Sequence, residues 1–260
     1  MKVLFIGDIM GAPGRRAVEE LLHRLVDRFN IDLVVANGEN AAGGIGLTPP
    51  VAEQLLGLGV DLLTTGNHIW KHSEIVPYLE ATDRVLRPAN YPPGTPGRGH
   101  AVLETAAGER AAVINLEGRV FMNPLECPFR TADQILAQLD PRIKVILVDM
   151  HAEATSEKLA MGWYLAGRVS AVVGTHTHVQ TADERLLPGD TGYLTDVGMT
   201  GPLDSVIGMK TEIILTRFLS QRPQTFKVAT ANIRLQGAVL TFDPAGRCLE
   251  VLRVDVPLKA

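Results

Sequence analysis

The chain has 260 residues, of which 46% are hydrophobic and 21% charged, an ordinary balance for a folded protein that is long enough to bury a substantial core. Its formal net charge of −4 argues against DNA, long RNA or an anionic membrane as a partner, whereas a small anionic substrate stays compatible because a local metal site can dominate the nearby field. No apolar run approaches the ~20 residues of a membrane span, and the first residues lack the features of a signal peptide.

The first part of the chain alternates apolar strands with helical patterns. A strand is predicted over 2–7, followed by an amphipathic helix over 13–29 with a proline near its start. Further strands are predicted over 32–38 and 61–67, with a helix at 49–57 between them. This alternation is typical of layered α/β proteins with a largely parallel sheet.

The middle of the chain continues the pattern. Three β-rich apolar runs, at 110–116, 144–152 and 170–178, are predicted to be strands. Helical stretches at 130–139 and 155–167 separate them.

The last part of the chain reads differently. The stretches 192–198 and 235–256 look like antiparallel strands, with a helix near 210–220, and this mixed ending suggests a second sheet made of hairpins. The Pro/Gly-rich stretch 87–100 is the one candidate linker, but strand patterns resume on both sides. We therefore expect a loop there, inside a single domain that covers residues 1–260.

Polar side chains collect where five of the predicted strands end. Ligands of open α/β sheets bind outside the carboxyl ends of strands, so these groups converge if the strands are parallel. In chain order the groups are Asp8, Glu39, Asn40, Asn67, His68, His151, His176 and His178. Carboxylate, amide and imidazole groups without cysteine suit iron, manganese or zinc better than calcium. Seven of them would serve two metals at the ~3.5–4 Å separation of two-metal hydrolases.

Each group alone also has a structural interpretation. Asp8 can cap the following helix, the "NGEN" of 37–40 is a turn signal, and His151 is compatible with a hydrogen-bonded histidine near the core. The pair His176 and His178 is a stronger signal, because alternate residues of an extended segment point to the same side. Together the groups favour a metal site. The histidines expected to lie outside it are His23, His72 and His100.

Three motifs resemble those of the calcineurin-like metallophosphoesterases. They are "GD" at 7–8, "GNH" at 66–68 and "GTHTH" at 174–178, each after an apolar strand. The usual pattern of that family is GDxH, GDxx, GNHE, a lone His and GHxH. This chain departs from it, with Met10 in place of the first His, Glu39 in place of the bridging Asp and Ile69 in place of the Glu after GNH.

These departures match one branch, and the chain resembles the YmdB-like family of bacterial phosphodiesterases. The matching segments span nearly the whole chain and include "FIGDIMGAPGR", "VVANGENAAGGIG", "TTGNHIW", "VDMHAEATSEK", "GTHTHVQTAD" and "LTDVGMTGP". The resemblance implies an α/β fold, a four-layer αββα sandwich of the metallophosphoesterase type with mixed sheets. It also implies two divalent or trivalent transition metals per chain, iron first, with manganese or zinc as alternatives.

The resemblance further implies a role for each group. Six residues divide into one set of three for each metal: Asp8, Asn40 and His178, and Asn67, His151 and His176. Glu39 would bridge the two metals, and Asn40 would replace the ligand that is missing at Met10. His68 follows the ligand Asn67 but is needed by neither metal, so we expect it to be the general acid.

The expected reaction is hydrolysis of a phosphodiester by a hydroxide that bridges the two metals. The family implies 2′,3′-cyclic nucleotides as substrates and 3′-nucleotides as products. A phosphomonoesterase or a 3′,5′-cyclic-nucleotide phosphodiesterase with the same centre is an alternative, and a nucleotide-sensing regulatory module with little turnover is another.

The two cysteines favour a reducing compartment. Cys127 and Cys248 lie far apart and outside any CxxC pair, so we expect both to be reduced, as in a cytoplasmic protein. The expected partner is a small cyclic nucleotide, with no membrane and no long nucleic acid, and the formation of a homo-oligomer stays open.

Overall fold

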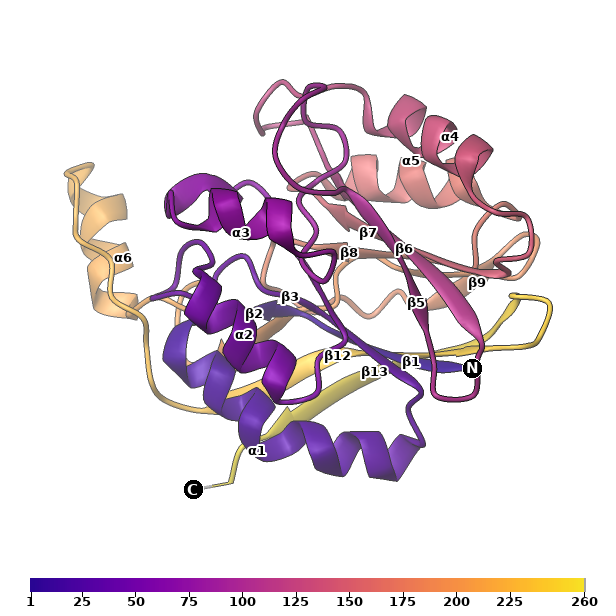
Figure 1. Cartoon of the computed structure of the whole chain (residues 1–260). Coiled ribbons are helices and arrows are strands. Elements are labelled where there is room, and N and C mark those ends of the chain that lie inside the picture. The colour runs from indigo at the N-terminus through magenta and orange to yellow at the C-terminus, as the bar shows by residue number, and fades with distance from the viewer. Residues whose placement is uncertain (260) are drawn as a thin grey trace.

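Two mixed sheets pack face to face, and helices cover both outer faces. The computed structural model describes residues 1–259. Figure 1 shows the layers in the order helices, first sheet, second sheet and helices. The predicted αββα sandwich is therefore confirmed.

The first sheet combines the beginning of the chain with its end. Its strands stand in the order β2 (Asp8–Ile9), β11 (Met199–Pro202), β12 (Ile233–Phe242), β1 (Lys2–Ile6), β3 (Leu33–Asn37) and β4 (Leu62–Thr64), with β13 (Cys248–Pro257) paired to β12. Strands β1, β3 and β4 are parallel, whereas β12 runs antiparallel to β1.

The second sheet is built from the middle of the chain. Its order is β5 (His100–Glu104), β6 (Arg110–Glu117), β7 (Val145–His151), β8 (Ala171–Thr175), β10 (Thr191–Leu194) and β9 (Arg185–Leu187). Strands β6, β7, β8 and β10 are parallel, and the two edge strands are antiparallel to their neighbours.

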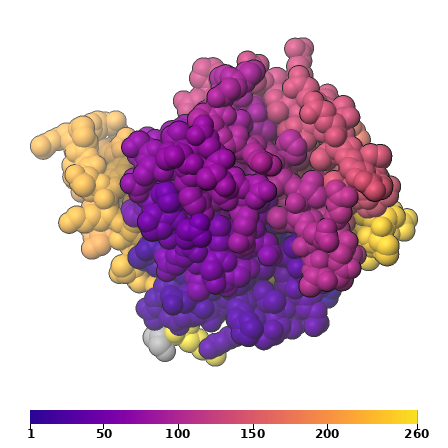
Figure 2. All heavy atoms as spheres, in the orientation of Figure 1, coloured from indigo at the N-terminus to yellow at the C-terminus, as the bar shows by residue number. Residues whose placement is uncertain are grey.

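The helices form the two outer layers. They are α1 (Gly11–Phe29), α2 (Pro49–Gly57), α3 (Ile75–Ala81), α4 (Pro128–Gln138), α5 (Thr155–Leu165) and α6 (Thr211–Ser220), with a 3₁₀ turn η1 (Ile69–Lys71). Helices α1, α2 and α3 pack on the first sheet, and α4 and α5 on the second. Helix α6 stands away from the body of the molecule, at the left in Figures 1 and 2. None of these helices is long and apolar enough to cross a membrane.

Strand β1 shows how the sequence builds the layers. Val3 and Phe5 belong to the core between the sheets, whereas Leu4 and Ile6 belong to the core beneath α1 and α2, and all four side chains are fully buried. A strand covered on both faces reads as a continuous apolar run. The apolar run therefore stops where the strand reaches the edge of the sheet, and polar side chains follow it there.

The end of the chain differs from the prediction of a separate sheet of hairpins. Strands β12 and β13 do form an antiparallel hairpin, but β12 lies beside β1 in the first sheet. The prediction of antiparallel pairing for 192–198 was also wrong in part, because β10 runs parallel to β8. A strand pattern identifies the strand but not its neighbour, since pairing depends on residues far away in the chain.

Candidate metal centre

The parallel strands of both sheets end at one edge of the sandwich, and the predicted site residues gather there. Glu39, His151 and His176 each place one ligand atom within 4.8 Å of the others. Hydrogen bonds and ion-pair contacts link these three to the rest of the set, namely Asp8, Asn40, Asn67, His68 and His178. The structure therefore brings together all eight residues that the sequence singled out.

Three atoms crowd around Nε2 of His151. Glu39 Oε2 lies at 3.2 Å, Asn67 Oδ1 at 3.1 Å and His176 Nδ1 at 3.1 Å. On the other side of the ring, Nδ1 lies 2.9 Å from the hydroxyl of Thr175, which donates its own proton to Asp149 at 2.7 Å. The hydroxyl must therefore accept from Nδ1, so Nε2 is the nitrogen that can bind a metal when the ring loses its second proton.

The other two histidines are oriented in the same way by partners outside the cluster. His176 directs Nε2 to Glu153 Oε2 at 3.1 Å, so its Nδ1 faces His151. His178 donates from Nδ1 to the carbonyl of Ile207 at 3.0 Å, so its Nε2 points toward Asp8. Partners that bind the outer nitrogen fix the tautomer and orient the inner nitrogen toward a metal.

A second group of possible metal ligands lies around Asp8. Its Oδ1 is buried without a hydrogen-bond partner and lies 3.6 Å from His178 Nε2. Asn40 Nδ2 lies 3.1 Å from that same nitrogen, while Asn40 Oδ1 faces His68 Nδ1 at 2.8 Å. For Asn40 to serve as a ligand beside His178, its amide must therefore turn so that the oxygen faces inward.

Glu39 lies between the two groups. Its Oε2 faces His151, and its Oε1 lies 3.0 Å from His68 Nδ1 and 3.1 Å from Asn40 Nδ2. Burial alone would raise the pKa of Glu39, but attraction to His151 and His68 outweighs it and holds that pKa well below its usual range. Burial likewise opposes ionisation of Asp8, and its contact with His178 outweighs burial and lowers the pKa of Asp8.

The arrangement fits a bound metal ion. Ring nitrogens and oxygen atoms face one another across about 3 Å, and their lone pairs repel unless a positive charge lies among them. Without a metal that charge is a proton on His151, because burial, which lowers the pKa of His151, is outweighed by attraction to Glu39, which raises that pKa to about 9. A bound metal ion would take the place of the proton. The orphaned oxygen of Asp8 has the same need. Carboxylate, amide and imidazole ligands suit iron, manganese or zinc.

The backbone of the "HTH" segment corrects one step of the prediction. His176 and His178 have φ angles of 98° and 64°, so they reach the site from a left-handed turn rather than from an extended strand. Asp196 stabilises this turn, because its Oδ2 accepts from Thr177 N at 3.1 Å and from Thr177 Oγ1 at 2.8 Å. Lys158 Nζ binds the same oxygen at 2.7 Å, and both charged side chains are buried.

Two local features of the sequence have a direct geometric reason. A Cβ atom on Gly66 would overlap the imidazole of His151 and the carboxylate of Glu39, so only glycine fits there. Asp8 belongs to β2, and the N-cap of α1 is Met10 without a side-chain hydrogen bond, so Asp8 does not cap that helix.

Sequence reasoning missed the residues that support the site. Asp149, Thr175, Glu153, Lys158 and Asp196 all lie within or beside segments that resemble the family, yet no role was predicted for them. A carboxylate inside the apolar strand "VILVDMH" was the available signal for Asp149.

Glu117 was also missed. It ends β6 directly across from His151 and is fully buried. Among residues 1–259 neither of its carboxylate oxygens has a hydrogen-bond partner, and burial raises the pKa of Glu117 to about 7. No local pattern in the sequence distinguishes it from the polar end of any other strand.

Comparison with known proteins gives consistent matches. The family model described as YmdB-like protein matches residues 4–254. A Bacillus subtilis (strain 168) protein named 2′,3′-cyclic-nucleotide 2′-phosphodiesterase is 49% identical over 94% of this chain and 92% of its own length.

Solved structures agree with these sequence matches. A hypothetical protein from Thermus thermophilus is 48% identical, with a TM-score of 0.93 over 99% of both chains. A structure titled as a novel phosphatase from Mycoplasma pneumoniae is 31% identical, with a TM-score of 0.93 over 99% of this chain and 93% of that one. A 5′-nucleotidase precursor from Thermus thermophilus, 15% identical with a TM-score of 0.61, covers 99% of this chain and 54% of its own and shares the fold.

We predict that the buried pair Lys158–Asp196 contributes strongly to stability. Lys158→Met leaves a buried carboxylate without its cation, so the free energy of unfolding should fall by about 3–5 kcal/mol. Arg253→Met is the matched control, since Arg253 and Glu184 are 37% and 29% exposed, and it should cost less than about 1 kcal/mol. Urea unfolding of both variants measures this, and equal losses would contradict the assigned role of Lys158.

Proposed function

The chain belongs to the YmdB-like protein family, and we propose from this premise that it is a metal-dependent phosphodiesterase that converts 2′,3′-cyclic nucleotides to 3′-nucleotides. The observation that carries the proposal is the cluster of potential ligand atoms, from Glu39, Asn67 and His176, around His151 Nε2. The name of the Bacillus subtilis relative supplies the substrate class.

The proposed centre holds two transition metals, with iron first and manganese or zinc as alternatives. One set of ligands is Asp8, Asn40 and His178, and the other is Asn67, His151 and His176. The position of Glu39 supports a bridging role, because each of its oxygens faces a different set. When bound, such metals lower the pKa of water and neutralise charge on phosphate oxygens.

His68 is the proposed general acid. Its Nδ1 lies at Asn40 Oδ1 and Glu39 Oε1, so Nε2 is the atom left to deliver a proton, and 27% of the side chain is exposed. In the ring opening, the oxygen of water forms a new bond to phosphorus and the bond from phosphorus to the 2′-oxygen breaks. The 2′-oxygen then takes the proton from Nε2, which leaves a 3′-phosphate, and the proton that the attacking water releases passes to solvent, from which His68 is protonated again.

A phosphomonoesterase is the second candidate, because the Mycoplasma pneumoniae structure is titled a phosphatase. Metal-loaded protein should hydrolyse 2′,3′-cAMP faster than 3′,5′-cAMP or p-nitrophenyl phosphate in parallel assays. Fastest turnover of p-nitrophenyl phosphate would favour the phosphatase instead. Tight binding of 2′,3′-cAMP with negligible turnover would point to a nucleotide-sensing module.

The metal content tests the bridging role of Glu39. Protein purified without chelator should contain about two transition metals per chain, the number that its seven proposed ligands would serve. Glu39→Gln should lose both metals together, because the bridge contributes charge to each. Elemental analysis and rates on one preparation measure this, and a variant with normal metal content and rate would remove Glu39 from the bridge.

His68→Ala should separate proton donation from metal binding. The variant should keep its metals and lose about 10²–10⁴-fold in rate on 2′,3′-cAMP, whose alkoxide leaves poorly without a proton. The loss should be much smaller on bis(p-nitrophenyl) phosphate, because its phenolate leaves unaided. Equal losses on the two substrates, or a loss of metal, would show that His68 only orients the neighbouring ligands.

A further inference from the structure

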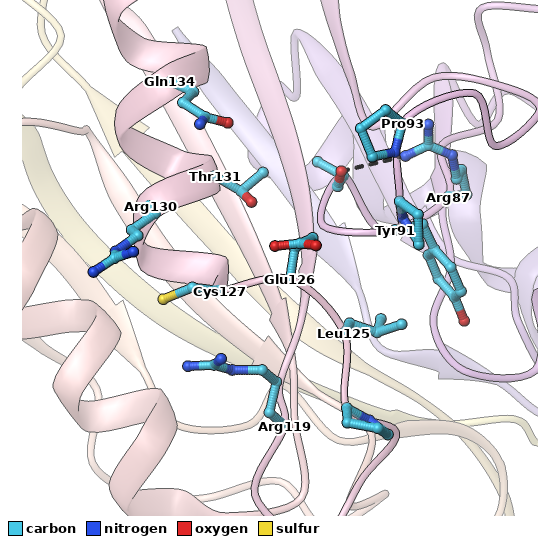
Figure 3. Close-up of a pocket in the computed structure, with 13 residues that line it drawn as sticks. Arg87, Tyr91, Pro93, Arg119, Leu125, Glu126, Cys127, Arg130, Thr131 and Gln134 are labelled. Carbon is cyan, nitrogen blue, oxygen red and sulfur yellow. Dashed lines mark hydrogen bonds between the residues drawn. The ribbon is translucent and has the colours of Figure 1, made fainter.

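A cavity of about 730 Å³ lies beside the metal centre, a size in the usual range for small-ligand sites. Figure 3 shows Tyr91 and Arg87 at one end and Arg119 and Arg130 at the other, next to Cys127. One wall is the segment 87–93, and the other is formed by 119–134.

Both walls are connected to the proposed site, one through the ligand His151 and the other through the turn that follows His68. Gly118 N donates to the carbonyl of His151 at 2.9 Å, so Arg119 leaves the sheet one residue beyond that contact. On the opposite wall, the ring of Tyr91 packs edge-on against Trp70 with the ring centres 5.5 Å apart. Trp70 lies in the η1 turn that follows His68 directly.

Buried polar side chains hold the two walls in place. Asn90 links them, because its Nδ2 donates to the carbonyls of Glu117 and Glu126 at 2.8 and 3.0 Å and its Oδ1 accepts from Glu117 N at 2.9 Å. Glu157 accepts from the backbone of Arg119 and Val120 at 3.0–3.1 Å. The two walls of the cavity are thus held in place by hydrogen bonds within the chain.

The charges of the cavity are not balanced within the chain. The guanidinium group of Arg87 binds the carbonyls of its own loop. Arg119 and Arg130 are exposed, and within residues 1–259 their guanidinium groups have neither a hydrogen bond nor an ion pair. Glu126 is the acidic residue that lines the cavity, and it is exposed. Two arginines without partners against one carboxylate give the cavity a local positive charge that suits a ligand with a negative group.

We propose that the cavity binds the 5′-phosphate of the nucleotide whose cyclic phosphate lies at the metal centre, so that the substrates are short oligoribonucleotides ending in a 2′,3′-cyclic phosphate. The inference rests on the proposed function. A free 2′,3′-cyclic nucleotide has a single phosphate, which the metal centre takes, and the two arginines then have no partner. In an oligoribonucleotide, the next phosphate lies one sugar away and carries the charge that they need.

The apolar part of the cavity suits the rest of such a ligand. Tyr91, Pro92 and Pro93 form one face, and flat apolar side chains of this kind pack against the bases and sugars of single-stranded RNA. The net charge of −4 opposes long nucleic acids, but it does not oppose a dinucleotide held by two local arginines.

The test compares adenosine 2′,3′-cyclic phosphate with the dinucleotide ApA that ends in the same cyclic phosphate. Arg119→Gln/Arg130→Gln should lower kcat/KM for the dinucleotide by about 10- to 100-fold, as expected for charge-assisted hydrogen bonds, and change it for the mononucleotide by less than about twofold. Arg24→Gln/Arg28→Gln, at two exposed positions on α1, is the matched control and should change neither.

Removing the negative charge of the cavity gives a second, independent test. Glu126→Gln removes the opposing carboxylate, so it should tighten binding of the product ApAp in calorimetric titrations and leave the binding of 3′-AMP unchanged. The Arg119→Gln/Arg130→Gln variant should bind ApAp more weakly and 3′-AMP with unchanged affinity. This preference for ApAp should also shrink as salt rises, since phosphate contacts are screened.

Three results would overturn the inference. They are equal losses on both substrates in the arginine variant, no loss on either, or a weaker affinity of Glu126→Gln for ApAp. Each leaves the proposed function standing if the wild-type protein hydrolyses the mononucleotide. Absence of turnover on both substrates by metal-loaded wild-type protein would instead overturn the proposed function itself.

Discussion

The structure depends on one buried carboxylate. Glu39 is fully buried, and each of its oxygens faces a different group of ligand atoms, one around His151 and the other around Asp8 and Asn40. A buried anion is costly unless positive charge compensates it. The two sheets must therefore end at the same edge, since Glu39 comes from the first and His151 from the second, and Gly66 must lack a side chain to let them meet.

Polar contacts behind the proposed ligands determine which nitrogen of each imidazole faces the site. Thr175 and Asp149 hold the proton of His151 on the outer nitrogen, and the carbonyl of Ile207 does the same for His178. Asp196 and Lys158 stabilise the left-handed turn between the last two histidines. Left-handed backbone at two non-glycine residues is unfavourable by itself, so its presence at the site is a feature that the surrounding fold maintains.

The positions of the charged residues affect ligand binding more than the net charge of the chain does. The whole chain carries −4, yet the cavity next to the metal centre presents Arg119 and Arg130 without acidic partners among the described residues. A small number of local cations can select a phosphate that the net charge would repel, because screening in salt limits the effect of distant charges to roughly 10 Å. The proposed metal centre and the proposed phosphate site in the cavity would together accept a ligand with more than one phosphate.

The sequence alone determined the features that depend on residues close together in the chain. Apolar runs that end in Asp8, Glu39, Asn67 or His151 located the strands and the polar groups at their ends, because this information depends on neighbours in the chain. The sandwich fold was implied by the resemblance of the motifs to a known family. Tertiary structure alone decided that β12 pairs with β1, which hydrogen bonds orient each imidazole, and that 87–93 and 119–134 enclose a cavity. These features depend on contacts between residues far apart in sequence, and periodicity carries no information about such contacts.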